Sequence, residues 1–382
     1  MRLRLLTLNV WGLPAPLSHA PEARARAIGE RLASLSLDVA AFQEVWSTEQ
    51  AALLAEHGAR AGLVHAWSEG AGIGNGGLVL LSRWPIERAH FEPFLLCGLP
   101  QRVAQMDYWG NKGFLTTRLA TPAGALDVIA THLHAAYGYS GYADEFVGHR
   151  MAEIVQIAAA VAATPLPIAV AGDLNAYSYR SELTVARGAT GLVDVARALG
   201  KAEASVVPQS AYRPRENAPG PRIDYVLVRP GASLGLAPVD VARVLDEEIV
   251  IEGRRAAYSD HAGILAELEL GGPGTPLPAP DERALARARR TLAYGRRIAA
   301  ARRRKQQVAA LGGGAIGTAC VLAARTRRRG AQRALGLGHA AAAFAPSALA
   351  LGLAEGFTPR ELRAYDRVDE ILAHLEALGA AR

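Results

Sequence analysis

Short apolar runs that end in a polar residue alternate with helix-like segments over the first 270 residues. Runs of four to eight apolar or alternating residues predict strands, and apolar residues spaced three or four apart predict helices. The predicted strands are RLRLLTLN (2–9), DVAAFQE (38–44), GGLVLLS (76–82), KGFLTTRLA (112–120), LDVIATHLH (126–134), PIAVAGD (167–173), RIDYVLV (222–228) and AGILAELEL (262–270). An amphipathic helix is predicted at 22–35, and the short connection ATPAG (120–124) predicts a hairpin and therefore a mixed sheet.

The pattern changes after residue 270. LGGPGTPLPAPDE (270–282) is dense in Pro and Gly and has no periodicity, so we predict a catalytic domain at 1–270, a linker at 271–282 and a helical tail at 283–382. The tail has an Arg-rich helical segment, two uncharged runs (308–324 and 334–354) separated by RTRRR, and a final amphipathic helix. The runs have the length of a membrane span but are rich in Ala and Gly, and Pro346 is expected to interrupt the second. Both a spanning hairpin and attachment to an anionic membrane surface fit this pattern.

The charge is divided along the same boundary. After Gly271 there are 19 basic and 8 acidic residues, against 23 and 28 before it, so the first part is acidic and the tail basic. A nucleic-acid enzyme usually carries its positive charge around the active site, which argues against nucleic acid as a partner. Two cysteines exclude a disulfide framework or a Cys-rich zinc site. No apolar signal segment follows MRLRLLTLNV, which predicts a cytoplasmic catalytic domain.

Polar residues of similar chemistry stand at the ends of the predicted strands. They are Asn9, Glu44, His132, His134, Asp173, Asn175, Asp224, Asp260 and His261. Each one alone has an ordinary explanation as a turn, cap or surface residue. Ligands of open α/β sheets gather outside strand ends, so together these residues predict one crevice. Oxygen donors dominate the set, which favours Mg²⁺ over zinc.

In this order the motifs resemble the endonuclease/exonuclease/phosphatase superfamily, and within it the membrane-anchored neutral sphingomyelinases. The stretches that carry the resemblance are TLNVWGLP, QEVWS, GLVLLSRWPI, KGF, THLHAAY, GHR, GDLN, RIDYVL and SDHAGILAEL. GDLN with SDH marks the superfamily, and NVWGLP, EVWS and THLHAAY narrow it to sphingomyelinase-like members. The resemblance implies a four-layer α/β sandwich of two mixed sheets with outer helices, followed by the C-terminal helical tail.

The resemblance also implies a role for each residue. Glu44, helped by Asn9, would hold Mg²⁺. Asn175 would donate a hydrogen bond to the phosphate, and His132 would do likewise or protonate the leaving group. Asp173 and His261 would position and deprotonate water, with His261 oriented by Asp224 or Asp260, and either could take the proton.

The expected activity is phospholipase C-type hydrolysis of sphingomyelin, or a related choline (lyso)phospholipid, to a lipid alcohol and phosphocholine. The aromatics of AAYGYSGYADEF (135–146) either cage the choline or form a surface cluster. The alternatives are a nuclease, an inositol-phosphate phosphatase that uses the same site, and an inactive membrane-binding module. The headgroup, the acyl chains and the oligomeric state are left open by the sequence.

Overall fold

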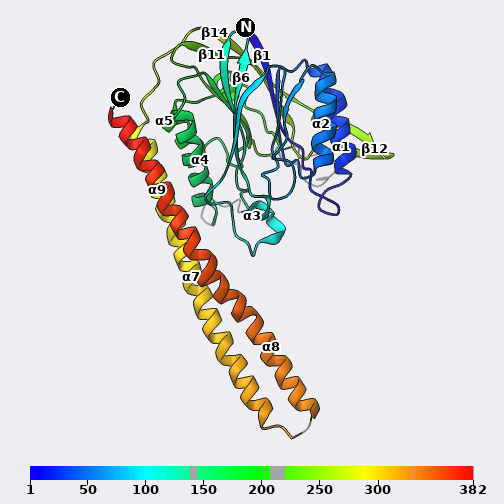
Figure 1. Ribbon diagram of the computed structural model, residues 1–382, viewed down its shortest axis with the longest axis vertical. Helices are drawn as coiled ribbons and strands as arrows, with labels where there is room; N and C mark the ends of the chain where they lie inside the picture. Colours follow the sequence, from blue (N-terminus) through cyan, green and yellow to red (C-terminus); the bar gives the residue numbers. More distant parts are fainter. Residues whose placement is uncertain (138–143, 207–219, 329, 382) are drawn as a thin grey trace.

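The computed structural model describes residues 1–137, 144–206, 220–328 and 330–381. Two mixed six-stranded sheets pack face to face, with helices on their outer faces (Figure 1). The first sheet has the order β11 (Leu234–Val244), β14 (Gly263–Pro273), β1 (Arg2–Asn9), β2 (Val39–Gln43), β4 (Val79–Ser82), β3 (His65–Trp67). The second has the order β5 (Ile86–Pro93), β6 (Gly113–Thr121), β7 (Gly124–His132), β8 (Ile168–Asp173), β10 (Asp224–Arg229), β9 (Val193–Asp194). This is the predicted sandwich.

Helices cover both outer faces, and a small hairpin stands apart from the two sheets. The longer helices are α1 (Pro21–Leu32), α2 (Thr48–Arg60), α4 (Val147–Ala162) and α5 (Ser181–Thr190). The short ones are α3 (Asp107–Gly110), α6 (Val195–Ala198) and the 3₁₀ turns Ala33–Leu35 and Val103–Gln105. Strands β12 (Glu248–Ile251) and β13 (Arg254–Ala257) pair only with each other among the described strands.

Alternation along the strands builds a separate core on each side of the first sheet. Leu3 and Leu5 of β1 belong to the cluster between the two sheets, whereas Leu6 and Leu8 face α1 and α2. Side chains two apart on a strand share a face, so one strand serves both layers. The eight predicted strands are all present, and β6 and β7 are antiparallel across ATPAG as predicted.

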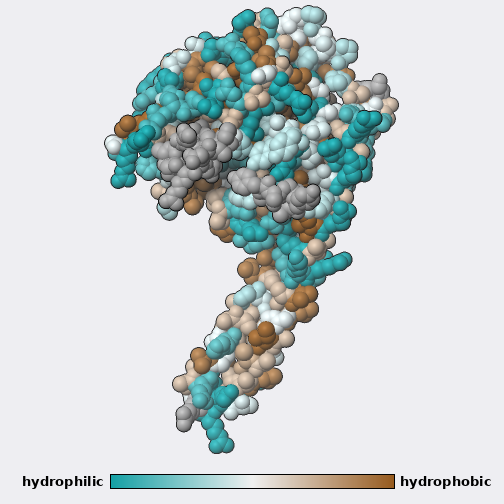
Figure 2. All heavy atoms as spheres, turned by 180° about the vertical axis from the view of Figure 1, so that it is seen from behind, coloured by the Kyte–Doolittle hydropathy of each residue, from teal (hydrophilic) through white to brown (hydrophobic). Residues whose placement is uncertain are grey.

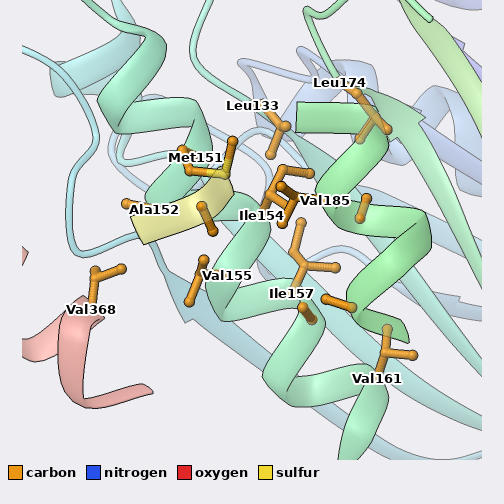
Figure 3. Close-up of a cluster of buried hydrophobic side chains, with 14 of the residues drawn as sticks. Leu133, Met151, Ala152, Ile154, Val155, Ile157, Val161, Leu174, Val185 and Val368 are labelled. Carbon is orange, nitrogen blue, oxygen red and sulfur yellow. The ribbon is translucent and has the colours of Figure 1, made fainter. Parts of the chain in front are cut away.

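The third core lies on the outer face of the second sheet, where α4 and α5 pack (Figure 3). Val155 and Ile157 of α4 and Val368 of the tail belong to this cluster. The tail helix α7 approaches α4 closely: a Cβ on Gly295 would lie 2.7 Å from the Cα of Gly148. The tail therefore adds a further helical layer to this side of the sandwich.

The tail is a long helical hairpin. Helix α7 (Glu282–Arg325) joins the Arg-rich segment and the first uncharged run in one helix of 44 residues, about 66 Å long. The chain returns as α8 (Gly330–Gly352), a π-helical turn (Leu353–Phe357) and α9 (Thr358–Ala381), and half of the hairpin projects beyond the sandwich (Figure 1). Pro346 lies inside α8, so the expectation that it interrupts the second run is wrong. Proline removes one N–H donor and crowds the carbonyl four residues before it, and α8 continues past Pro346 in spite of this cost.

Candidate active site

The strand pairing brings the predicted site residues to one edge of the two sheets. The parallel pairs β1/β2 and β7/β8 end together, with Asn9 opposite Gln43 and His132 opposite Asp173. Strand β10 runs antiparallel to β8 and begins at Asp224, directly opposite Asp173. Strand β14 begins two residues after His261. Ends of parallel strands and starts of antiparallel strands thus meet in one place.

The loop after β8 is shaped by two local interactions. The backbone N–H of Asn175 donates to Oδ1 of Asp173 at 2.9 Å, and its side-chain amide donates to the Leu133 carbonyl at 3.0 Å. A Cβ on Gly172 would lie 1.9 Å from the carbonyl oxygen of Thr131, so this position in the sheet accepts only glycine. Asn175 itself has a φ of +46°, in the left-handed region that asparagine tolerates better than most residues. The chain therefore turns sharply at the strand end.

His261 is held by a fully buried carboxylate. Its Nδ1 lies 2.9 Å from Oδ2 of Asp224, and its Nε2 faces Asp260 Oδ1 at 3.9 Å and Asp173 Oδ2 at 4.0 Å. Burial alone lowers the pKa of His261, but the charges of Asp224, Asp260 and Asp173 outweigh it and raise the pKa well above its usual value. Of the two acids that the sequence offered to orient this imidazole, Asp224 makes the hydrogen bond to it.

Glu44 and Asn9 lie on the first sheet and face Asp173 on the second. The Asn9 amide donates to Glu44 Oε1 and to Asp173 Oδ2, both at 3.1 Å, and its Oδ1 accepts the Trp11 N–H. The Trp46 indole N–H lies 3.4 Å from Glu44 Oε2. Burial raises the pKa of Glu44, and the opposing charge of Lys112 does not cancel this effect. Asn9 thus links the two sheets by donating to a carboxylate on each side.

Lys112 belongs to the site although no role was predicted for it. Its Nζ contacts Asp107 Oδ1 at 2.5 Å, His132 Nε2 at 2.9 Å and the Leu133 carbonyl at 3.1 Å. An ammonium has only donors, so His132 accepts at Nε2. Burial, followed by the Lys112 charge, lowers the pKa of His132 well below its usual value. The signal that could have found Lys112 is the KGF motif, which was used only for the resemblance.

The other predicted histidine, His134, lies behind this group. Its ring stacks on Phe146 with centroids 4.0 Å apart, and its Nε2 is 3.8 Å from Asp107. Burial lowers the pKa of His134 to about 4. Tyr137 donates to Asp107 Oδ2 at 2.6 Å. His134 is therefore packed in the wall of the site and does not face the other strand-end residues.

A cleft of about 310 Å³ lies between the ends of the sheets. Of the site residues, it is lined by Glu44, Lys112, His132, Asp173, Asn175, Asp260 and His261, whereas Asn9, Asp224 and His134 are not part of its lining. It is walled by polar groups from both sheets and by the rings of Trp11, Trp46, Tyr137 and Tyr177. Arg24 lies over the Trp11 ring and Arg180 over the Tyr177 ring. Tyr139 and Tyr142, part of the aromatic segment noted in the sequence, lie outside the described residues.

Two positions at the cleft are suited to a metal ion. Asp173, Asp224 and His261 have ligand atoms within 4.8 Å of one another, the one such group among the described residues. The 2.9 Å hydrogen bond between His261 and Asp224 already occupies part of this triad. Glu44 offers a second position, and its side chain is 18% exposed toward the cleft.

The geometry can be compared with known proteins. A profile of the Endonuclease/Exonuclease/phosphatase family matches residues 6–261. The chain belongs to this family. A Drosophila melanogaster protein provisionally named a neutral sphingomyelinase is 30% identical over 277 residues, which cover 71% of this chain and 61% of that protein. Human sphingomyelin phosphodiesterase 2 is 27% identical over 291 residues, 70% of this chain and 64% of the human protein. The chain thus spans about three fifths of the length of these relatives.

Further similar proteins differ in the lipid that their names give and in how similar they are to this chain. Inositol phosphosphingolipids phospholipase C of Schizosaccharomyces pombe is 34% identical over 182 residues, 45% of this chain and 41% of that protein. Among solved structures, SmcL has a TM-score of 0.54 at 18% identity and covers 70% of this chain and 99% of its own. Sphingomyelinase C of Streptomyces griseocarneus has a TM-score of 0.50 at 23% identity, covering 72% and 100%. At these identities the solved structures establish the fold alone.

Proposed function

We propose that the protein is a Mg²⁺-dependent phosphodiesterase of the phospholipase C type that hydrolyses sphingomyelin, or a related choline (lyso)phospholipid, to a lipid alcohol and phosphocholine. The observation that carries this proposal is the placement of His261 Nε2 about 4 Å from both Asp173 and Asp260, in a cleft that Asn175, Lys112 and His132 also line. A water bridging these groups would stand opposite a phosphate bound between the two sheets. Relatives named for sphingolipid phosphodiester hydrolysis support the substrate class.

The residues of the cleft fit a magnesium ion. Burial raises the pKa of Glu44, so the ionised carboxylate would be stabilised by a cation bound beside it. Mg²⁺ is usually bound by one or two carboxylates and keeps several waters. Glu44 would hold the ion, and Asn9 would fix the Glu44 carboxylate or, with its amide turned, bind the ion itself. When bound, Mg²⁺ supplies positive charge to the phosphate and the leaving alkoxide. A solved relative, Staphylococcus aureus beta toxin, is described with bound magnesium ions.

The chain's own groups then divide the proton transfers. Water forms the new P–O bond, the bond to the lipid oxygen breaks, and Asp173 or His261 accepts the water proton. Asp224 holds His261 in the required tautomer through Nδ1, and Asp260 helps to place the water. Asn175 would donate to a non-bridging phosphate oxygen after leaving the Leu133 carbonyl. The departing lipid oxygen would take its proton from the Lys112–His132 pair.

The second candidate is the same hydrolysis of an inositol phosphosphingolipid, favoured by the relative of that name. The choline headgroup is preferred because Trp46 and Tyr137 offer rings in the cleft, whereas the cleft ammonium of Lys112 already has three partners. Nuclease activity is disfavoured because residues 1–271 have a net charge of −5. An inactive membrane-binding module is disfavoured because each predicted catalytic position carries a suitable side chain.

The tail is proposed to anchor the protein to a membrane. Helix α7 and the helical segment Gly330–Ala380 each contain an 18-residue window apolar and long enough to cross a bilayer, with mean hydropathies of 1.6 and 1.4. Only 17% and 11% of the residues in these windows are buried in the protein, unlike a core helix. We propose a catalytic domain at 1–270 in the cytoplasm, joined by the linker at 271–282 to a hairpin at 283–382.

A substrate panel tests the proposed activity. Full-length protein with and without Mg²⁺ is incubated with sphingomyelin, lysophosphatidylcholine, an inositol phosphosphingolipid and duplex DNA. Phosphocholine release that requires Mg²⁺ is the expected result. Preferential cleavage of the inositol lipid would select the second candidate, and cleavage of DNA alone would refute both lipid assignments.

The membrane anchor is tested by pelleting the full-length protein with membranes. Pelleting that resists carbonate and is lost on truncation after Leu270 supports the anchor, and a fully soluble full-length chain refutes it.

A further inference from the structure

The hairpin changes from polar to apolar at the same level on both of its helices. On α7 the basic cluster closest to the sandwich ends at Lys305, and no charged residue follows until Arg325 at the end of the helix. On the returning helical part of the hairpin, Glu355 is the first acidic residue after the uncharged run. It pairs with Arg303 at 2.6 Å and with Gln307 at 2.7 Å. Beyond this level the large side chains are exposed, with Leu311 at 75%. Figure 2 shows this projecting part covered mainly by apolar side chains, with a hydrophilic tip.

The polar-to-apolar boundary touches the wall of the catalytic cleft. Phe357, two residues after Glu355, packs edge-on against Tyr108 with ring centroids 5.6 Å apart. Tyr108 lies in the segment 99–112, whose residues 104–106 line the cleft. Figure 1 places α3 of this segment at the end of the sandwich from which the hairpin projects. The cleft wall and the start of the apolar surface therefore lie at the same level along the hairpin.

Large apolar side chains are exposed next to this contact. Ile73, Val103 and Trp109, which we call the rim, are 49%, 59% and 47% exposed. Ile73 lies in the loop before β4, and Val103 and Trp109 lie in the segment 99–112. Hydrogen bonds from Asn111 Nδ2 to the Gly74 carbonyl and from the Gly76 N–H to the Gly110 carbonyl join the two segments. None of the three lines the cleft. Trp109 packs edge-on against Tyr108 with ring centroids 5.3 Å apart, and Tyr108 contacts Phe357, so the rim is linked to the hairpin at its polar-to-apolar boundary.

We propose that the rim rests on the surface of a lipid bilayer, held at that height by the packing of Tyr108 against Phe357. The proposal rests on the function assigned above and adds a surface to it. A bilayer is the occupant that fits, because the rim adjoins a hairpin long enough to insert and because exposed cations surround the boundary. These cations are Arg304, Lys305, Arg360 and Arg363. They match anionic headgroups, while the apolar rim matches the interface itself.

This placement brings the substrate phosphate to the cleft at the level of the lipid headgroups. A lipid would then need to rise only slightly from the bilayer to reach Asn175 and His261. A water-soluble substrate gains nothing from the rim. Hydrolysis of bilayer lipid and hydrolysis of a dispersed lipid should therefore respond differently to changes in the rim.

The test compares initial rates of full-length protein on two substrates. One is sphingomyelin in phosphatidylcholine vesicles with anionic lipid, and the other is short-chain sphingomyelin below its critical micelle concentration. Val103→Asp should lower the vesicle rate at least tenfold and leave the soluble rate within twofold. Val250→Asp is the matched control, since Val250 is 73% exposed on β12, away from α7 (Figure 1), and both of its rates should stay within twofold. Phe357→Ala should also reduce only the vesicle rate.

A spectroscopic measurement is independent of turnover. Brominated lipid in the vesicles should quench part of the tryptophan emission of the wild-type protein, and Trp109→Phe should remove that part. An unchanged vesicle rate in Val103→Asp, or equal quenching in the Trp109→Phe variant, overturns the rim proposal. Failure of the wild-type protein to cleave either form of sphingomyelin would instead refute the proposed substrate.

Discussion

Replacing Asp224 with asparagine isolates the contribution of one hydrogen bond to His261, which with Asp173 is one of the two proposed proton acceptors. Asp224 is fully buried, and its Oδ2 lies 2.9 Å from Nδ1 of His261. Asparagine has the same shape but presents either an amide NH₂ or a neutral carbonyl to the imidazole. With the NH₂ in place, Nδ1 becomes an acceptor and the proton moves to Nε2, which then cannot take a proton from water.

The expected loss in kcat is about 10² to 10⁴-fold, the range found for a misoriented proton-transfer group. This corresponds to about 2.7 to 5.5 kcal/mol of transition-state stabilisation. The pH profile should change as well. Carboxylates led by Asp224 raise the pKa of His261 against the effect of burial, so the neutral imidazole forms only at higher pH. The wild-type rate should rise with pH as the proton leaves, and in Asp224→Asn the rise should move to lower pH with a lower plateau.

The assay is kcat and kcat/KM for phosphocholine release as a function of pH, with thermal unfolding to confirm that the variant is folded. Asp240→Asn is the matched control, because Asp240 is 47% exposed and pairs with Lys201 on the surface. The control should retain the wild-type kcat and profile. A folded Asp224→Asn protein with wild-type kcat would refute the role given to His261.

Three further predictions concern the metal, a buried acid and the tail. Mg²⁺ should raise the Tm of the wild-type protein and not that of Glu44→Gln, since binding to the native state stabilises it; equal shifts in both would remove Glu44 from the metal site. Burial raises the pKa of Glu153 to about 8, so the native state holds an extra proton and the free energy of unfolding falls by about 1.4 kcal/mol per pH unit between about pH 4.5 and 8. Glu153→Gln should flatten this fall and be more stable than wild type at pH 8, and parallel curves in denaturant titrations would contradict the assignment. Gly295→Ala should cost about 1–3 kcal/mol because its Cβ would meet Tyr365 Oη at 2.5 Å, whereas Gly312→Ala, which meets nothing within 4 Å, should cost nothing; similar Tm values would mean that α7 does not pack as described.

The sequence predicted the central strands because their burial is nearly complete. The strands β1, β2, β7 and β8 read as apolar runs, and parallel pairing explains why residues at their ends meet. The edge strands β5 and β11 were not predicted. Strand β5 is largely solvent-exposed and carries charged side chains, whereas β11 is mostly half-buried and has Pro238 at an irregularity in its pairing. An edge strand tolerates charges, prolines and irregular pairing, so the alternation of apolar and polar residues that predicts a strand is lost there.

The same reasoning explains what was predicted of the site. Asp173, Asp224 and His261 follow from strand order, since the register places two of them opposite each other. The contacts of Lys112 with Asp107 and His132 depend on how the segment 99–112 folds back onto the sheet, which no local periodicity encodes. The hydrogen bond from His261 to Asp224 likewise joins residues 37 apart in the chain. Sequence therefore indicated which groups are present, and only the folded chain indicates which partner each one takes.

Hydrolysis of sphingomyelin in ¹⁸O-labelled water tests the central claim most directly, because it reports which bond breaks and which atom attacks. Full-length protein with Mg²⁺ should release phosphocholine that contains one ¹⁸O atom, together with an unlabelled lipid alcohol, since water held by Asp173 and His261 attacks phosphorus. Label in the lipid alcohol, or release of free choline instead of phosphocholine, would contradict this account.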